Sequence, residues 1–256
     1  MRGLPFFMIP TTLMGQVDSS TAGKTCLNTP MTKNLLGTFY YPLVVYNNTR
    51  FLDTVHECDQ RQGFSEVFKY GLLRSPSLVQ ALREYHAHPA PALLKRIIID
   101  TIGVRIAVRK IHPQASNLGH TFGHALEALS GYRILHGDAI SAGTAVALHF
   151  AVEKGWMPKL EMACILSIMK ELGLNLYIDD SIDSRTWLEA MRRDKKSSAT
   201  KVNLVLIQGI GKPIQGSFFS ISFADLRKFL DRFLASYPYK MRNCHAMLKK
   251  GIAYAH

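Results

Sequence analysis

Apolar residues change their spacing along the chain near residue 57. Before that point, residues 5–10 and 43–46 are short apolar runs bounded by Pro, Thr and Asn, and they predict two short buried strands. The polar stretch between them, residues 16–25, predicts a loop. From residue 57 to about residue 174, apolar side chains recur at helical spacing. The pattern therefore predicts a strand-bearing part followed by a long helical part.

Proline and serine mark where the predicted elements begin and end. Breaks in the helical pattern are expected at three places: Ser75-Pro76, His88-Pro89 and His112-Pro113. After the helices, residues 202–207 predict a strand that opens a hairpin toward residues 217–218. Residues 222–233 predict a closing helix, with Ser222 or Asp225 near its N-terminus.

The composition fits one large domain or two small ones. The chain has 256 residues, 47% of them apolar, and no apolar run reaches the ~20 residues needed to cross a bilayer. The first residues lack the small-residue cleavage pattern of a signal peptide, and no membrane association is expected. The cysteines show no paired spacing and are expected to be free thiols of a cytoplasmic protein: Cys26, Cys58, Cys164 and Cys244.

The formal net charge of +12 is compatible with nucleic-acid binding or with an anionic small-molecule ligand. The basic residues are dispersed, and the densest groups, residues 192–196 and 240–242, have no interleaved aromatic side chains for base stacking. We therefore interpret the excess as solvated surface together with a pocket for an anionic small molecule. Nucleic acid is not expected as a partner.

Histidines at helical spacing are the first candidates for chemistry. His120 and His124 lie four residues apart, so both imidazoles project from one face of a predicted helix, and His136 starts the next apolar stretch. Glu66 places a carboxylate in an apolar helical pattern. One Glu and two His with an open fourth position are the ligands of a catalytic zinc site. A surface histidine pair and a solvated helix glutamate are the ordinary alternatives, but apolar and Gly neighbours favour the metal because buried charges need partners.

Polar residues of the predicted loop region are candidates for phosphate binding. Four of them lie among small residues and turn formers: Asp18, Lys24, Lys33 and Asn34. Ligands of α/β sheets collect at the carboxyl ends of strands, and ammonium and amide groups suit a phosphate oxyanion. The alternative, that each is an ordinary surface residue, stays open for any one of them.

A series of short motifs occurs in one order along the chain. They are Met1-Arg2-Gly3, Ile9-Pro10-Thr11-Thr12, Val17-Asp18-Ser19-Ser20, Gly23-Lys24-Thr25, Lys33-Asn34, Ser65-Glu66-Val67, Lys69-Tyr70-Gly71, Asn117 with His120 and His124, His136-Gly137 and Asp194-Lys195-Lys196. In this order the motifs resemble the sugar phosphate cyclases, and most closely the 3-dehydroquinate synthase family. The resemblance runs from residue 2 to about residue 211.

The resemblance implies a fold that is α/β at the start and all-α afterwards. Residues 1–56 would be the C-terminal remnant of a Rossmann-like, NAD-binding domain. Residues 57–256 would form a multi-helical metal- and substrate-binding domain with a late β-hairpin. A cytoplasmic homodimer is also implied.

The activity implied by the resemblance is that of a carbon–oxygen lyase of the shikimate pathway, which leads to aromatic amino acids. Such an enzyme converts 3-deoxy-D-arabino-heptulosonate 7-phosphate to 3-dehydroquinate and releases phosphate. Its cofactors would be NAD and a divalent metal, zinc or cobalt. Because the hydride taken up by NAD is returned within the cycle, the enzyme is a lyase rather than a dehydrogenase.

By matched position, the resemblance also implies roles for single residues. The metal would be held by Glu66, His120 and His136. The catalytic residues would be Lys24, Lys69, Asn117 and His124. The substrate would be bound by Arg2 (from the neighbouring subunit), Lys24, Asn34, Asn117, His124, Lys195 and Lys196. The cofactor would be lined by Thr11, Thr12, Asp18, Lys24, Lys33 and Thr54.

Two departures from the family pattern change these expectations. The sequence starts well inside the nucleotide-binding domain, without the Gly-Gly-Gly segment that cradles the pyrophosphate, so weak NAD binding is expected. Residues 209–211 are too late and too short to replace that segment. The stretch before Asn117 is shortened and lacks the arginine that binds the substrate carboxylate, for which Arg105 or Arg109 could substitute.

The missing arginine leaves two alternatives open. One is another sugar phosphate cyclase whose substrate has no carboxylate, similar to 2-deoxy-scyllo-inosose synthase or 2-epi-5-epi-valiolone synthase. The other is a non-catalytic metal- and phosphate-binding remnant that pairs with a complete homologue.

Overall fold

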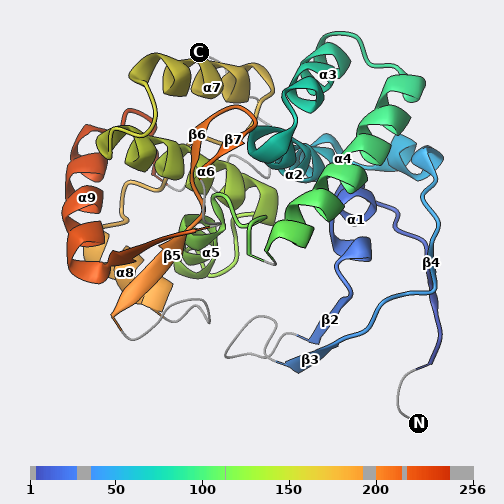
Figure 1. The fold of residues 1–256 in the computed structure, drawn as a ribbon, viewed down its shortest axis with the longest axis horizontal. Helices are drawn as coiled ribbons and strands as arrows, with labels where there is room; N and C mark the ends of the chain where they lie inside the picture. The colour runs from blue at the N-terminus through green and yellow to red at the C-terminus, as the bar shows by residue number, and fades with distance from the viewer. Residues whose placement is uncertain (1–3, 28–35, 113, 193–199, 215–217, 243–256) are drawn as a thin grey trace.

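The computed structural model describes residues 4–27, 36–112, 114–192, 200–214 and 218–242 (Figure 1). In these ranges the chain is mostly helical, and its strands form separate two-stranded ladders. The strand-bearing N-terminal part lies to one side of the helices, and the late strands lie among the C-terminal helices (Figure 1). No helix within the described ranges is both long and apolar enough to cross a bilayer.

Two short ladders make up the N-terminal part. β1 (Phe7–Met8) pairs in parallel with β4 (Val44–Val45), with Phe7 opposite Val44 and Met8 opposite Val45. β2 (Lys24–Leu27) pairs antiparallel with β3 (Leu36–Phe39). Three short helical segments accompany them: α1 (Leu13–Val17), η1 (Ser19–Thr21) and η2 (Thr49–Thr54).

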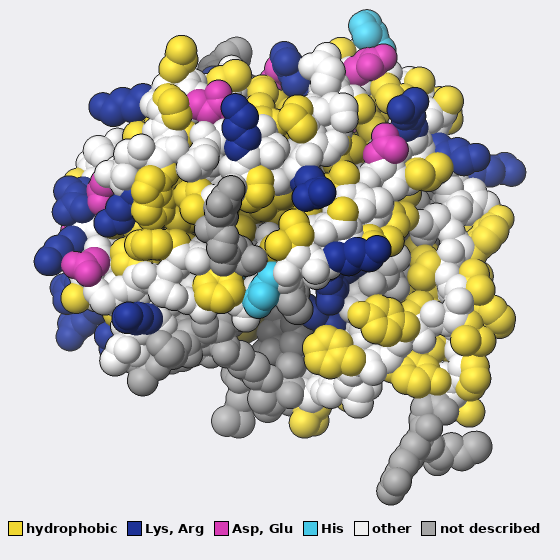
Figure 2. All heavy atoms as spheres, in the orientation of Figure 1, with side chains coloured by type: hydrophobic (Ala, Val, Ile, Leu, Met, Phe, Trp, Pro, Cys, Tyr) yellow, Lys and Arg dark blue, Asp and Glu magenta, His cyan; other side chains and the backbone are white. Residues whose placement is uncertain are grey.

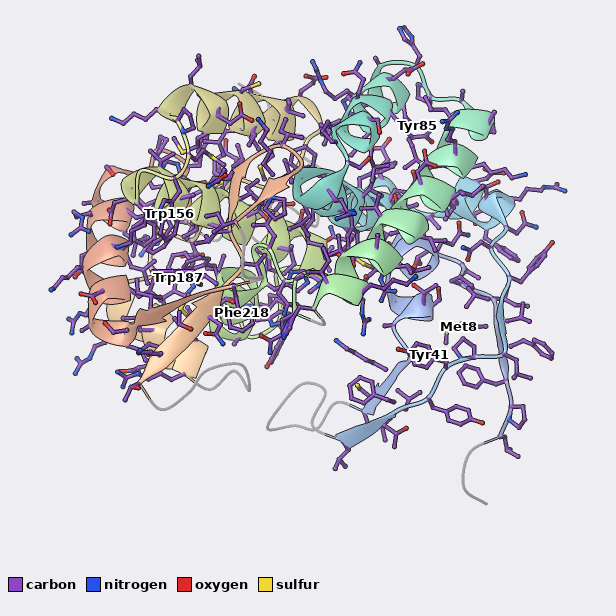
Figure 3. The ribbon with its side chains drawn as sticks, in the orientation of Figure 1. Met8, Tyr41, Tyr85, Trp156, Trp187 and Phe218 are labelled. Carbon is purple, nitrogen blue, oxygen red and sulfur yellow. The ribbon has the colours of Figure 1, made fainter. Side chains whose placement is uncertain are left out.

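The strands predicted within residues 5–10 and 43–46 form, but the prediction that they are buried is wrong. Phe7 is 70% exposed and Val44 is 50% exposed. Hydrophobic side chains gather on this side of the molecule, at the lower right of Figure 2, and the N-terminal side chains in Figure 3 have few neighbours. Parallel strands are normally covered on both faces, whereas every residue of these two is exposed or only half-buried.

The prediction of a loop over residues 16–25 is also wrong, because the stretch contains the end of α1, all of η1 and the start of β2. The helix α1 begins where Thr12 Oγ1 accepts a hydrogen bond from the Gly15 amide at 3.1 Å. Leu13 and Val17, one turn apart, are both buried. A five-residue helix is too short to give a periodic pattern, so only its packing reveals it.

The helical part opens with α2 (Glu57–Arg74), α3 (Pro76–Ala87) and α4 (Pro91–Ile111). Pro76 and Pro91 lie in the first turn of their helices, where a missing amide hydrogen breaks no helical hydrogen bond. Ser75 caps α3, since its Oγ accepts from the Leu78 amide at 3.3 Å. The first two predicted breaks are confirmed, and α4 ends where the third was expected.

The remaining helices are α5 (His120–Leu129), α6 (His136–Glu153), α7 (Lys159–Glu171), α8 (Ser184–Arg192) and α9 (Phe223–Ser236). Small and apolar residues run along all sides of α6, which is almost wholly buried and packs against α2, α5, α7 and α9. Aromatic side chains fill the core beside it: Phe122 meets Trp187 edge-on, and Phe150 meets Phe229 in the same way. Trp156 and Trp187 lie in this part of the molecule (Figure 3).

The closing helix forms where the sequence predicts it, but the single strand predicted over residues 202–207 is divided into two shorter strands, and Ser217 of the expected hairpin lies outside the described residues. β5 (Lys201–Leu204) pairs antiparallel with β8 (Phe219–Ser222), and β6 (Ile207–Gly209) pairs antiparallel with β7 (Lys212–Pro213). Ser222 caps α9, because its Oγ accepts from the Asp225 amide at 3.1 Å. The helix α8 was not predicted. The described cysteines are free thiols, as expected: Cys26, Cys58 and Cys164. Cys244 lies outside the described residues.

Candidate metal centre

Three side chains from separate helices converge at one point. Glu66 lies in the middle of α2, His120 is the first residue of α5, and His136 is the first residue of α6. The Nε2 atom of each histidine lies 3.8 Å from Glu66 Oε1, and the potential ligand atoms of all three residues lie within 4.8 Å of one another. Residues separated by up to 70 positions thus form one cluster.

Glycines allow the three helices to approach closely enough to form this cluster. A Cβ atom on Gly137 would lie 2.6 Å from the Cα of Gln62, so any side chain there would push α6 away from α2. A Cβ atom on Gly143 would lie 2.2 Å from the carbonyl oxygen of Gly119, in the turn before α5. The backbone distances of the site therefore depend on these positions having no side chain.

Hydrogen bonds between α2 and the first turn of α6 fix the position of His136. Gln62 Nε2 donates to Asp138 Oδ2 at 3.0 Å, and the Asp138 amide donates to Gln62 Oε1 at 2.9 Å. Arg61 Nε also donates to Asp138, at 3.1 Å. Burial raises the pKa of the Asp138 carboxyl, although Arg61 and Gln62 act to lower it.

The burial, hydrogen bonding and spacing of the potential ligand atoms in this cluster fit a divalent metal ion. Glu66 Oε1 is buried and makes no hydrogen bond with any described residue, which is costly for a carboxylate oxygen. The 3.8 Å separations are too long for hydrogen bonds. Two ligands of one tetrahedral zinc ion lie about 3.4 Å apart, close to these separations. The Nδ1 atom of His120 lies 3.1 Å from the Leu118 carbonyl oxygen, which leaves Nε2 to face Glu66.

Lys69 compensates the other oxygen of Glu66. Its ammonium group pairs with Glu66 Oε2, and both side chains are almost completely buried. The Lys69 Nζ atom also lies over the ring of Tyr70, 4.2 Å from its centroid. Lys69, predicted to be catalytic, therefore lies directly beside the candidate metal ligands.

A second charged group links α1, α2 and α4. Arg105 Nε donates to Asp18 Oδ1 at 2.6 Å, and the Tyr70 hydroxyl donates to the same oxygen at 2.7 Å. Burial acts to raise the pKa of Asp18, but the positive charges of Lys69 and Arg105 and the two hydrogen bonds hold it at about 2. Asp18 was predicted to line the cofactor. Sequence reasoning missed its pairing with Arg105, although an arginine on the buried side of α4 was the available signal.

Of the other predicted site residues, some lie beside the metal cluster, some lie on the N-terminal part, and some fall outside the described residues. The ring of His124 lies 5.3 Å from that of His120 and 5.9 Å from that of His136, so all three imidazoles share one site. Asn117 lies in the turn before α5, where its carbonyl oxygen accepts from the His120 amide. Four predicted residues lie on the exposed N-terminal part: Thr11, Thr12, Lys24 and Thr54. Five lie outside the described residues: Arg2, Lys33, Asn34, Lys195 and Lys196.

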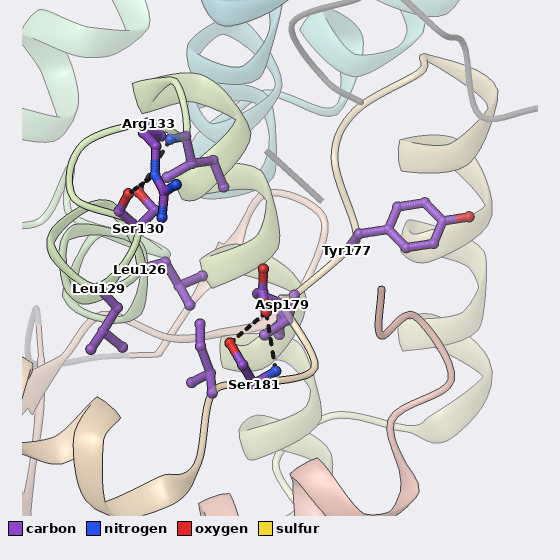
Figure 4. A pocket seen from close by; sticks show the side chains of 10 residues that line it. Leu126, Leu129, Ser130, Arg133, Tyr177, Asp179 and Ser181 are labelled. Atoms are coloured by element: carbon purple, nitrogen blue, oxygen red, sulfur yellow. Dashed lines mark hydrogen bonds between the residues drawn. The ribbon is translucent and has the colours of Figure 1, made fainter. Parts of the chain in front are cut away.

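A separate cavity of about 100 Å³ lies at the opposite end of α5 (Figure 4). Leu126, Arg133 and Tyr177 are among the residues that line it. Its polar groups bind one another, since Ser181 Oγ donates to Asp179 at 2.6 Å and Arg133 Nε donates to a main-chain oxygen. The cavity does not include the candidate metal ligands.

The fold is that of the sugar phosphate cyclases. The structure of a 2-epi-5-epi-valiolone synthase from Streptomyces hygroscopicus, with NAD+ and Zn2+ bound, matches with a TM-score of 0.80 at 23% identity, covering 91% of this chain and 67% of that chain. A 2-deoxy-scyllo-inosose synthase complexed with carbaglucose-6-phosphate, NAD+ and Co2+ matches with a TM-score of 0.77 at 23% identity, covering 90% and 67%. The predicted fold class is confirmed.

The chain belongs to the 3-dehydroquinate synthase family. Residues 63–197 match the model of the 3-dehydroquinate synthase C-terminal region, and residues 1–62 match that of the N-terminal region. The 3-dehydroquinate synthase of Rhodopseudomonas palustris is 34% identical over 252 residues, covering 91% of this chain and 66% of the relative. That of Nitrosococcus oceani is 37% identical over 227 residues, covering 83% and 62%. The chain spans about two thirds of the length of these curated relatives.

Proposed function

We propose that this chain carries the metal- and substrate-binding part of a 3-dehydroquinate synthase-type lyase. The reaction converts 3-deoxy-D-arabino-heptulosonate 7-phosphate to 3-dehydroquinate and releases phosphate. Identities of 34–38% to curated 3-dehydroquinate synthases support this reaction class. The structural observation that carries the proposal is the buried Glu66 oxygen, which has no hydrogen-bond partner among the described residues and faces Nε2 of His120 and of His136.

The metal is assigned to Glu66, His120 and His136. A bound zinc or cobalt ion supplies Lewis-acid chemistry, which polarises substrate oxygens and lowers the pKa of a bound hydroxyl. The carboxylate of Glu66 brings the negative charge, and the two imidazoles bring neutral nitrogen ligands. Three protein ligands are the number typical of catalytic zinc sites.

The proposed substrate site lies around this cluster. His124 shares the site with both histidine ligands, and Asn117 precedes α5, so the two are proposed to contact substrate oxygens. Lys69 holds a buried positive charge beside Glu66, where it can donate hydrogen bonds to a substrate hydroxyl or carboxylate. Lys24 is proposed to reach the phosphate from β2. The further substrate contacts proposed from family position lie outside the described residues: Arg2, Asn34, Lys195 and Lys196.

NAD is the proposed second cofactor, and the described residues fit only part of it. Five of the residues proposed to line it are described, and their hydroxyl, carboxylate and ammonium groups suit a ribose and nicotinamide amide: Thr11, Thr12, Asp18, Lys24 and Thr54. Asp18 is held by Arg105 and Tyr70. No glycine-rich strand–turn–helix occurs in the described residues to cradle the pyrophosphate. We propose residues 1–56 as part of the nucleotide-binding unit and residues 57–256 as the metal- and substrate-binding unit.

A cyclase for a different sugar phosphate is the second candidate. It is favoured by the absence of a family-type arginine just before Asn117. Arg105, considered as a substitute, donates to Asp18 at 2.6 Å and to the Thr21 carbonyl oxygen at 3.0 Å, so its guanidinium is already engaged. A substrate without a carboxylate would not need that arginine.

Turnover assays separate the candidates. Purified protein with zinc or cobalt and NAD is incubated with 3-deoxy-D-arabino-heptulosonate 7-phosphate, glucose 6-phosphate or sedoheptulose 7-phosphate, and phosphate release and products are measured. Product formation from the first substrate alone supports the leading proposal, and turnover of either other sugar phosphate supports the second. Metal binding without turnover or NAD uptake supports a non-catalytic metal-binding role instead.

The metal assignment has its own test. We expect His120→Ala to weaken zinc binding by at least about 10-fold, because loss of a direct ligand costs no less than loss of a group behind it. Zinc content after dialysis is measured by elemental analysis. Unchanged zinc content would show that His120 is not a ligand of the site.

We further propose that the protein forms a homodimer. We also propose a cytoplasmic location, in line with the free thiols of the described cysteines.

A further inference from the structure

We propose that Glu127 is a positioning residue that aims His136 at the metal, an inference that rests on the proposed metal site. The Glu127 side chain is 4% exposed and lies in the last turn of α5. Its Oε2 atom lies 3.3 Å from Nδ1 of His136. Neither the sequence motifs nor the family resemblance assigned this glutamate a role.

The two nitrogen atoms of His136 face two different carboxylates. Nε2 lies 3.8 Å from Glu66 Oε1, whereas Nδ1 lies 3.3 Å from Glu127 Oε2. A carboxylate accepts hydrogen bonds, so the proton of the neutral imidazole belongs on Nδ1. That tautomer leaves the Nε2 lone pair free to bind a metal beside Glu66.

His120 offers a comparison within the same site. Its Nδ1 atom also has an acceptor, but that acceptor is the neutral Leu118 carbonyl oxygen at 3.1 Å. The acceptor beside Nδ1 of His136 is instead the anionic carboxylate of Glu127. An anionic acceptor makes an imidazole a stronger donor to a metal, so we expect the contribution of His136 to depend strongly on Glu127.

The loop between α5 and α6 fixes Glu127 relative to His136. The main-chain oxygen of Glu127 accepts from Ser130 Oγ at 2.8 Å and from the Tyr132 amide at 2.7 Å. Tyr132 has a φ of 60°, a left-handed conformation that is unfavourable for a non-glycine residue. The tight turn holds that conformation and sets the distance from the end of α5 to the start of α6.

An alternative role for Glu127 is direct metal ligation. The potential ligand atoms of His124, Glu127 and His136 also lie within 4.8 Å of one another. Glu127 Oε2 is engaged by His136, whereas Glu66 Oε1 has no partner among the described residues. The free carboxylate oxygen therefore marks Glu66 as the ligand and Glu127 as the residue behind it.

Zinc affinity and cobalt spectra test the proposal. The chain, Glu127→Ala, Glu127→Leu and Glu127→Gln are titrated with zinc against a chelator, and the cobalt-loaded forms are compared by visible absorption. We expect Ala and Leu to weaken zinc binding by about 10–100-fold, and Gln to weaken it less because an amide oxygen still accepts from Nδ1. The cobalt bands should keep their positions, since the ligands are unchanged. Glu161→Gln, which alters a carboxylate that accepts from the Ile210 amide, is the matched control and should bind zinc normally.

Several outcomes would overturn the inference. Affinities of Glu127→Ala and Glu127→Leu within twofold of the parent would show that Glu127 does not support His136. Two zinc ions per chain, or shifted cobalt bands in Glu127→Gln, would show that Glu127 is itself a metal ligand. If Glu127→Ala does not fold, Glu127→Leu keeps the volume and decides. A parent chain that binds no zinc would refute the proposed metal site itself. The zinc content of His120→Ala tests that site independently of Glu127.

Discussion

Replacing Lys69 by methionine should remove the positive charge that compensates the buried carboxylate of Glu66. The two side chains form a buried ion pair, with 3% of the lysine and none of the glutamate side chain exposed. Methionine has a similar length and no charge, so Lys69→Met leaves a carboxylate buried without its counter-charge. Zinc or cobalt bound at the proposed site would provide a replacement positive charge. The variant should therefore be destabilised mainly when metal is withheld.

The expected loss follows from the burial of the pair. Removing one partner of a buried ion pair costs about 3–5 kcal/mol. Protonating an ordinary glutamate at pH 7 costs about 4 kcal/mol, which sets a ceiling on the loss. A domain has only about 5–15 kcal/mol of total stability. For a chain of this size, the loss corresponds to a fall in Tm on the order of 10 °C.

Urea unfolding with a chelator and with saturating zinc measures the effect. In chelator, the unfolding free energy of Lys69→Met should fall by about 3–4 kcal/mol, and in zinc by clearly less. Because the coupling is reciprocal, the variant should also bind zinc at least about 10-fold more tightly, a change of about 1.4 kcal/mol or more.

The exposed pair Lys228–Asp225 provides a matched control. It has the same spacing along a helix, and both side chains are more than half exposed. Lys228→Met should change stability by less than about 0.5 kcal/mol with or without zinc. Equal losses for Lys69→Met in chelator and in zinc would refute the reasoning, because the metal would then not replace the lysine charge.

Other changes test the acid behaviour and packing of the site. The pKa of Asp18 is lowered to about 2, so its ionised carboxylate stabilises the folded state above about pH 4, and this stabilisation is lost as the pH falls toward 2. Between pH 5 and pH 2, the free energy of unfolding measured in urea should therefore fall by about 2 kcal/mol more for the parent than for Asp18→Asn. Gly137→Ala, whose Cβ would meet Gln62, should lower the free energy of unfolding by about 1–3 kcal/mol and weaken zinc binding. Gly103→Ala, with open space around its Cβ, should instead stabilise α4 by about 0.5–1 kcal/mol. Equal effects of the two variants on zinc affinity would contradict the close-packing argument. Ser222→Ala should lower the unfolding free energy by about 1 kcal/mol, and no change would show that the cap of α9 is dispensable.

Local signals predicted the helical part well. Pro76 ends one helix and starts the next because its ring cannot accept a preceding helical turn, and this constraint needs no tertiary contact. Ser222 marks the start of α9 for an equally local reason, because its side chain binds an amide three residues ahead. Such signals depend on neighbours in the sequence and are visible in it.

Contacts between distant segments were harder to predict. The pairing of Asp18 with Arg105 joins residues 87 positions apart, and neither residue indicates its partner. The exposure of Phe7 and Val44 was missed because an apolar run indicates burial whether or not a covering element is present. The convergence of Glu66 with the histidines was expected from the family resemblance, whereas the glycines that permit it are recognised only from the packing of α2 and α6.

Because α5 and α6 both begin at the histidines of the cluster, the positive ends of two helix dipoles point at the same spot. An anion placed there gains from both helices as well as from any cation held by Glu66. Sulfate and inorganic phosphate in ordinary buffers should consequently compete with a negatively charged ligand. Kinetic constants measured in such buffers would understate the true affinity of the protein.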